Sequence, residues 1–240
     1  KELIMELHDG KSVEEVRGRF AKLIEGVSTQ EITEMGQNLV AEGMPIKEIQ
    51  RLCDVHAAVF KGSIAEIHSN LKVEETPGHP IQTFKLENRA IEDYIKNVAK
   101  PNLEKFINSH DEKVKTDLEG NVKSLREIDK HYSRKENLLF PFLEKAGITA
   151  PPKVMWGVDD EIREALKELE ADFGTKSPSG DIVQRLKDVF ARIGEMIFKE
   201  ENILFPMAIE TLSRDEWIAI ADDSDEIGYS FIKPQPKWLP

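Results

Sequence analysis

The amino-acid sequence has one cysteine, Cys53, and no long apolar run. A single cysteine excludes an internal disulfide framework and is typical of a reducing compartment. No stretch approaches the roughly 18 apolar residues that a membrane-spanning helix needs, and the N-terminus lacks the pattern of a signal peptide. These absences predict a cytoplasmic protein with no membrane partner.

Basic side chains are also in deficit. The 240 residues carry 33 Lys and Arg against 45 Asp and Glu, which gives a formal net charge of −12. Nucleic acids are bound through a basic face that pairs with phosphates, so this balance argues against a nucleic-acid partner. The sequence also offers no nucleophile–base arrangement and no glycine-rich phosphate loop, so no enzymatic activity is predicted.

What the sequence does contain is a helical spacing of apolar residues along almost its whole length. Residues 1–76 predict a small domain of short helices, with capping boxes at Ser12 and Ser28. Four longer amphipathic segments follow, beginning near residues 78, 114, 151 and 180, and Pro101 is expected to end the first. Together they predict an all-α fold, with an up-down four-helix bundle over residues 77–221.

A tail is expected after the bundle. A short capped helix at residues 213–221 ends the predicted bundle, and the acidic run at residues 222–226 is interpreted as a solvated linker. Pro234, Pro236 and Trp238 follow. Residues 222–240 are therefore predicted to be a tail that either clasps the bundle or leads towards a further domain.

An internal repeat marks one region of the predicted bundle. Residues 136–141 read Glu-Asn-Leu-Leu-Phe-Pro, and residues 201–206, which are 65 positions later, read Glu-Asn-Ile-Leu-Phe-Pro. Repetition of this kind predicts two helices placed equivalently about one centre. The alternative is that the two copies only pack alike, since Leu139 and Leu204 are core positions in both.

Alignment of the two copies places Lys135 opposite Glu200 and His131 opposite Met196. Lys135 and Glu200 fall within the apolar stripes of their helices, where a charge is costly unless it is paired or binds an ion. Ionic interactions are therefore predicted inside the bundle. The other polar residues on the inner faces or their edges are His79 and Glu87 on the first helix, Glu136 on the second, Asp159 on the third and Glu201 on the fourth.

Carboxylate and imidazole groups that converge in a bundle core are typical ligands of a non-haem iron or manganese site. The predicted metal ligands are His79, Glu87, His131, Glu136, Asp159, Glu200 and Glu201. The competing interpretation is a metal-free network of buried ion pairs, in which Lys135 pairs with Asp159 and Glu200. For Glu136 and Glu201, at the stripe edges, a solvated side chain is a further alternative.

These segments resemble a known family, the hemerythrin-like HHE cation-binding domains. The matching stretches are Gly78-His79-Pro80, His131 with residues 136–141, and Glu200-Glu201 with Phe205-Pro206. Residues 1–71 are similar to an uncharacterised helical domain often found in front of such domains. The resemblance implies a bundle around a di-iron or other cation site, with family roles in binding oxygen or nitric oxide, in iron handling and in sensing.

Several positions depart from the pattern of that family. Met196 stands where the fourth helix usually carries a histidine, and Asp159 stands where the third does. Lys135 occupies the position four residues after His131 at which a carboxylate is common. An ammonium group there takes roughly the space and charge of one metal, so the site is expected to hold one metal ion or none, and reversible oxygen carriage is not expected.

Two functions follow from these observations. The first is a non-haem metal-binding module, with mono- or dinuclear iron favoured over manganese, that senses or binds iron, oxygen or nitric oxide. Its partners are a metal ion and a small diatomic ligand. The second is a metal-free structural or protein-interaction module in which Lys135 and its carboxylates replace the metal centre. Its partner is another protein or a sensor domain of the kind that often follows in relatives.

Overall fold

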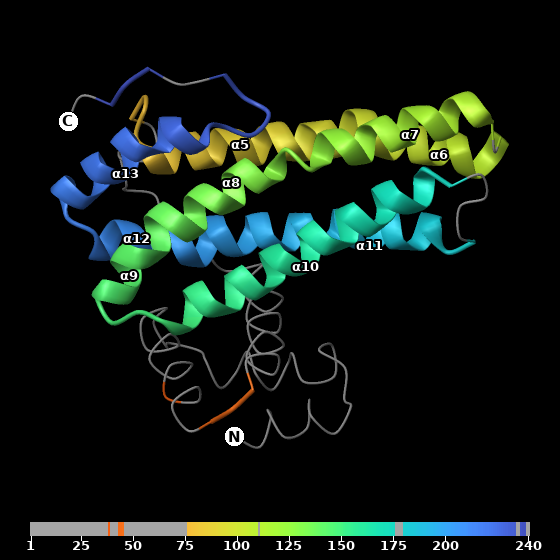
Figure 1. Ribbon diagram of the computed structural model, residues 1–240. Helices are drawn as coiled ribbons and strands as arrows, with labels where there is room; N and C mark the ends of the chain where they lie inside the picture. Colours follow the sequence, from red (N-terminus) through yellow and green to blue (C-terminus); the bar gives the residue numbers. More distant parts are fainter. Residues whose placement is uncertain are drawn as a thin grey trace.

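The computed structural model describes residues 38, 43–45, 76–109, 111–175, 180–233 and 236–238, and Figure 1 shows the long helices of the bundle side by side. Every regular element within these ranges is helical, as predicted. The predicted small domain at residues 1–76 falls almost entirely outside the described residues, and so does His110. No helix of the described part of the chain is long and apolar enough to cross a lipid bilayer.

The first arm of the bundle does not end at Pro101, contrary to the sequence-based expectation. It comprises helix α5 (Pro80–Tyr94), a π-helical segment η3 (Ile95–Ala99) and helix α6 (Lys100–Ser109). Proline lacks an N–H, and its ring collides with the carbonyl four residues earlier in a regular α-helix. The wider π turn, in which the Lys100 N–H bonds the Ile95 carbonyl, provides the different register in which the helix continues past the proline.

The other three arms follow in chain order. The second comprises α7 (Glu112–Leu125), α8 (Ile128–Arg134), the π-helical η4 (Lys135–Leu139) and α9 (Phe140–Lys145). The third is the single helix α10 (Ala150–Phe173), which packs against α7 and α11. The fourth comprises α11 (Ile182–Lys199), the π-helical η5 (Glu200–Leu204) and α12 (Phe205–Thr211).

The two copies of the sequence repeat share one unusual backbone conformation. The π-helical segments η4 and η5 begin at Lys135 and Glu200, the residues that the repeat aligns. In both copies the asparagine side chain donates to the carbonyl four residues earlier, from Asn137 at 2.8 Å and from Asn202 at 2.7 Å. Single π turns inside α-helices are frequent at functional sites. The repeat therefore marks equivalent places on two helices.

The C-terminal part differs from the expected linker. Helix α13 (Arg214–Ile227) begins with the predicted capping box of Ser213 and Glu216, but it continues through residues 222–226. The interpretation of this acidic run as a linker is therefore wrong. The buried hydroxyl of Ser224 donates to the Ile220 carbonyl at 2.6 Å, so one face of this stretch packs on the bundle while its acidic side chains face outward.

The core of the bundle is made of aliphatic and aromatic side chains on the inner stripes of all four arms. Leu139 and Leu204, the predicted core positions of the repeat, are both fully buried. Close packing around them is expected to make the cost of truncation large, because the cavity left by a smaller side chain is not filled.

We predict that Leu204→Ala lowers the free energy of unfolding by about 2–5 kcal/mol, as is typical of buried leucines. The neighbouring Ile203 is only partly buried, so Ile203→Ala is the matched control and is expected to cost clearly less. Urea denaturation followed by circular dichroism measures both. Equal losses of unfolding free energy in the two variants would contradict the placement of Leu204, rather than Ile203, on the buried apolar stripe.

Candidate functional site

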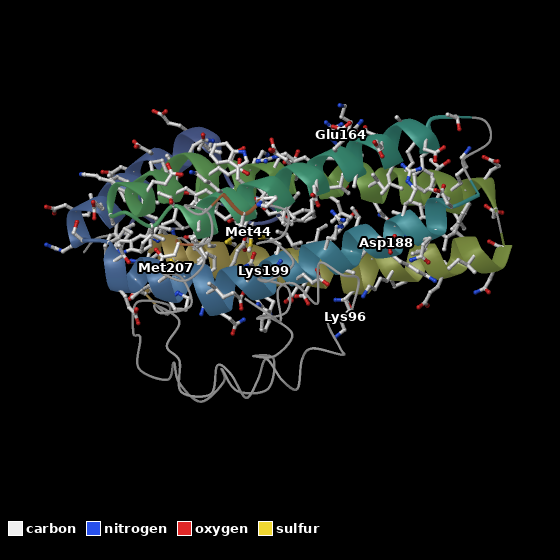
Figure 2. All side chains as sticks on the ribbon, turned by 90° about the horizontal axis from the view of Figure 1, so that it is seen from below. Met44, Lys96, Glu164, Asp188, Lys199 and Met207 are labelled. Atoms are coloured by element: carbon white, nitrogen blue, oxygen red, sulfur yellow. The ribbon has the colours of Figure 1, made fainter. Side chains whose placement is uncertain are left out.

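Lys135, Asp159 and Glu200 meet in the interior of the bundle, and none of the three has any solvent-exposed surface. The Lys135 ammonium lies 2.9 Å from Asp159 Oδ1 and 2.5 Å from Glu200 Oε1. It also lies 4.4 Å from the centre of the Tyr132 ring. By contrast, Figure 2 shows charged side chains such as Glu164 and Lys96 pointing away from the bundle. The first predicted feature of the site, a lysine between two inward carboxylates, is therefore present.

His131 extends this ion pair towards the first helix. Its Nε2 lies 3.0 Å from Glu200 Oε2, and its Nδ1 lies 2.9 Å from Glu87 Oε2. Arg134 also donates to Glu87 Oε2, and its guanidinium lies over the rings of both Phe84 and Tyr229. A continuous line of ionic contacts thus crosses the bundle, formed by Glu87, His131, Arg134, Glu200, Lys135 and Asp159. We call these six residues the ionic core.

The charges of the ionic core balance when all its groups are ionised. Three carboxylates, on Glu87, Asp159 and Glu200, face three cations, on His131, Arg134 and Lys135. Each is almost fully buried. Removing charges from water is far less costly when each has an opposite partner. The pairing explains how six ionisable groups can occupy the interior.

Each pKa in the ionic core reflects a competition between burial and pairing. Burial alone would lower the pKa of His131, but Glu200 and Glu87 outweigh it and raise the value to about 9. Burial alone would raise the pKa of Glu200, but Lys135 and His131 lower it to about 2. For Asp159 burial prevails over the Lys135 ammonium, so its pKa lies well above the ordinary value. Of the two carboxylates that share Lys135, Asp159 therefore takes up a proton first.

Glu136 and Glu201 lie apart from the ionic core. Both oxygens of Glu136 accept hydrogen bonds from Arg163, at 2.8 and 2.7 Å. Glu201 Oε1 accepts from Arg89 and, at 3.2 Å, from Asn88. The repeat thus places its two glutamates in similar clamps at the edges of the bundle. A role for either in metal binding stays a prediction.

His79 is also separate from the core, because it caps the start of α5. Its Nδ1 accepts a hydrogen bond from the Ile81 N–H at 3.1 Å, and its ring lies between Trp217 and Trp238, at centroid distances of 4.9 and 4.7 Å. Burial lowers the pKa of His79 to about 4. Glu87 follows about two helical turns later, so the structure does not bring these two predicted ligands together.

Sequence reasoning missed two residues that contact Glu87. Arg134 has a signal in the repeat, because it aligns with Lys199 and both are buried cations next to the aligned pair. Ser230, whose backbone N–H donates to Glu87 Oε1 at 2.6 Å, has no such signal. It lies 143 residues from its partner and contributes only its backbone, so no side-chain pattern identifies it.

Comparison with known families decides the assignment. A family model described as the hemerythrin HHE cation binding domain matches residues 79–208, which is more than half of the chain. The chain belongs to the hemerythrin HHE family. A second model, for a family of unknown function called DUF438, matches residues 1–66 in front of the hemerythrin domain. The predicted resemblance and its order along the chain are thereby confirmed. No curated protein sequence matches the chain.

Membership of the family supports a cation-binding helical module. Within the described ranges, no three His, Cys, Asp or Glu side chains are grouped so that they could hold a metal. The carboxylates of the core are already bound by protein cations, and the Lys135 ammonium lies between the two that face each other. Asp159 Oδ2 and Tyr132 Oη are left without partners, but two oxygens do not complete a coordination sphere. As arranged here, the described part of the hemerythrin domain offers a metal ion no complete set of ligands.

We predict that the two histidines by themselves give a stability that is greatest near pH 6.5 and falls on both sides, whereas the raised pKa of Asp159 acts against the limb below pH 6.5. The His131 ring, with its pKa raised to about 9, contributes fully below pH 6.5, and this contribution is lost as the pH rises to 9. The His79 ring, with its pKa lowered to about 4, stays neutral in the folded state while the unfolded chain takes up a proton below pH 6.5. Along each limb, the free energy of unfolding is expected to change by roughly 3 kcal/mol.

Urea denaturation across this pH range measures both limbs. His79→Asn keeps a side chain that can cap α5 but removes the titrating ring, so it is expected to flatten only the limb below pH 6.5. His131→Gln is expected to flatten only the limb above it, at a large cost in stability. A wild-type curve with no decline above pH 6.5 would show that His131 is not held as a buried cation.

Proposed function

We propose that the hemerythrin domain of this chain is a metal-independent member of its family and serves as a structural and protein-interaction module. The observation that carries the proposal is the Lys135 ammonium, fully buried between Asp159 and Glu200. It takes the position and charge that a metal ion would have between two inward carboxylates. The cation at the centre of this bundle is then the protein's own side chain.

Charge balance supports the same conclusion. The ionic core is neutral with its three cations in place, so a divalent metal added to it would leave two excess positive charges in a low-dielectric interior. A neutral lysine could act as a ligand only after losing its proton. Burial alone would favour that loss, but the nearby charges of Asp159 and Glu200 outweigh it and raise the pKa of Lys135 above its ordinary value.

The ionic core also gives the bundle a defined helix register. Its members come from α5, α8, η4, α10 and η5, so a shift of one arm along another separates buried charges from their partners. Buried polar networks are best attested in this specifying role. A scaffold of fixed register presents a constant surface to partners, and this property supports the interaction role.

A second candidate is favoured by the family match. In this alternative the domain is a non-haem iron or manganese module that senses or binds iron, oxygen or nitric oxide, as family members do. It requires the Lys135 side chain to leave the space between Asp159 and Glu200. It also requires His131 to release one of its two carboxylates, because both ring nitrogens are engaged.

We predict that the purified full-length protein contains less than about a tenth of an equivalent of iron or manganese per chain, before and after anaerobic loading with ferrous iron. Elemental mass spectrometry of protein purified without chelators or a metal-affinity column measures this. About one or two metal ions per chain would overturn the proposal and establish the second candidate.

Two substitutions of Lys135 test the role of its charge: one removes the charge and the other reverses it. Lys135→Met leaves Asp159 and Glu200 without their shared cation, and we expect it to lower the free energy of unfolding by about 3–5 kcal/mol. Lys135→Glu adds a carboxylate and is expected to gain about one equivalent of ferrous iron that stabilises the fold. Lys167→Glu, at an exposed position, is the control for both effects. If neither Lys135 variant changes stability, the central role of the ammonium is excluded.

A further inference from the structure

The chain after α13 folds back over the first helix. We call residues 228–233 and 236–238 the strap, and Figure 1 shows this segment running along the bundle beside α5 and α13. Lys237 pairs with Asp222 at 2.8 Å, and the Tyr229 hydroxyl donates to Asp225 at 2.6 Å. These two contacts hold the strap to the last turns of α13.

The strap reaches the ionic core through a backbone group. The Ser230 N–H donates to Glu87 Oε1 at 2.6 Å, and both residues are fully buried. His131 and Arg134 engage only the other oxygen of Glu87. Ser230 is therefore the hydrogen-bond partner that the structure gives to Glu87 Oε1. A buried carboxylate oxygen left without a partner is costly, so the pairing at Glu87 and the position of the strap depend on each other.

Aromatic contacts fix the strap on either side of this bond. The ring of Tyr229 lies 4.7 Å from the Arg134 guanidinium, which also contacts the ring of Phe84. The ring of Phe231 lies 5.0 Å from Tyr94 at the end of α5. Phe231 has a φ of 59°, in the left-handed region that a side chain rarely adopts, so its contacts hold the backbone in an unfavourable conformation.

The far end of the strap lies against the start of α5. Trp238 packs edge-on against His79, and the strap backbone passes so close to Gly78 that no side chain fits there. A Cβ on Gly78 would lie 2.2 Å from the Pro236 carbonyl oxygen and 2.8 Å from the Trp238 nitrogen. Glycine at this position is therefore a condition for seating the strap.

We propose that the strap is a releasable latch whose seating is coupled to the ionic core through Glu87. When the strap is seated against α5, Ser230 is buried and its N–H donates to Glu87 Oε1. An intact Glu87–His131–Arg134 cluster in turn holds that oxygen in position to accept the hydrogen bond. By linkage, an intact core favours seating of the strap by the same free energy by which seating favours the intact core.

Through this coupling, the buried charges and the strap influence each other. A partner that captures the strap in an extended form, through the side chains of Tyr229, Phe231 and Trp238, weakens the pairing at Glu87. Conversely, a disturbance of the ionic core releases an aromatic segment for recognition. Seating of the strap is measured independently of metal content, so the latch is tested separately from the proposed metal-free role.

The strap side is tested with a pair of glycine variants of the full chain. Gly78→Ala and Gly147→Ala both place a side chain at a positive φ, of 80° and 87°, but only the first collides with the strap. We expect amide hydrogen exchange, measured by NMR in the presence of a chelator, to become at least about tenfold faster at both Ser230 and Trp238 in Gly78→Ala. Gly147→Ala is expected to leave both amides unchanged.

The core side is tested with Glu87→Gln, which keeps the shape but removes the charge that pairs with His131 and Arg134. The exposed Glu92→Gln is the control. At least about tenfold faster exchange at Ser230 and Trp238 is expected in Glu87→Gln and none in Glu92→Gln. Should Glu87→Gln fail to fold, exchange is measured instead at the Asn88 amide, next to Glu87, in Gly78→Ala. Faster exchange there is expected, because release of the strap weakens the pairing at Glu87.

Two outcomes would overturn the proposal. One is faster exchange at Trp238 alone in Gly78→Ala, with Ser230 unchanged, because the strap would then not be released as a unit. The other is wild-type exchange at Ser230 in folded Glu87→Gln, because seating would then be independent of the core. Neither depends on metal content, so failure here is separate from failure of the metal-free assignment.

Discussion

The structure depends on one buried ammonium group. Lys135 lies between Asp159 and Glu200 with no exposed surface, and its removal would leave Asp159 without a cation and Glu200 with His131 alone. Because Glu200 also pairs with His131, and His131 with Glu87, the charge of Lys135 is the first link in a line that reaches α5. The arms of the bundle are therefore joined by charge complementarity as well as by apolar packing.

The π-helical segments are what place these charges opposite one another. In η4 and η5 the backbone widens before Pro141 and Pro206, each of which cannot continue a regular α-helical hydrogen-bond pattern. Since Lys135 and Glu200 open these segments, the backbone irregularity and the buried charge occur at the same step of each helix. A proline two residues after each segment thus imposes a local geometry that the repeat then uses twice.

The hemerythrin family provides a scaffold in which inward polar residues gather, and this chain fills that space with its own cations. Glu136 and Glu201 are likewise bound by cations of the protein, because an arginine from a neighbouring arm donates to each carboxylate. The strap adds the last donor from outside the four arms. In the proposed metal-free role, these ion pairs hold the carboxylates in the interior in place of a metal ion.

The sequence by itself determined the helical class, the family, the order of the arms and the inward charges at Lys135, Asp159 and Glu200. These follow from short-range regularities, namely apolar spacing, capping residues and a repeated motif, which require no knowledge of contacts. The sequence misjudged Pro101 and the acidic run at residues 222–226. Local rules treat proline and clustered charge as breakers, whereas a π turn and one buried face let both stay helical.

Only the tertiary structure decided which charges meet. It separated His79 from the ionic core, because the ring caps α5 between two tryptophans, and it brought in Arg134 and the backbone of Ser230. Pairing energies depend on distances between side chains that are far apart along the chain, and on the water excluded around them. Neither quantity is contained in the spacing of residues along one helix, so the pairing of Lys135 with Asp159 and Glu200 was one of two interpretations until the packed helices brought the three side chains together.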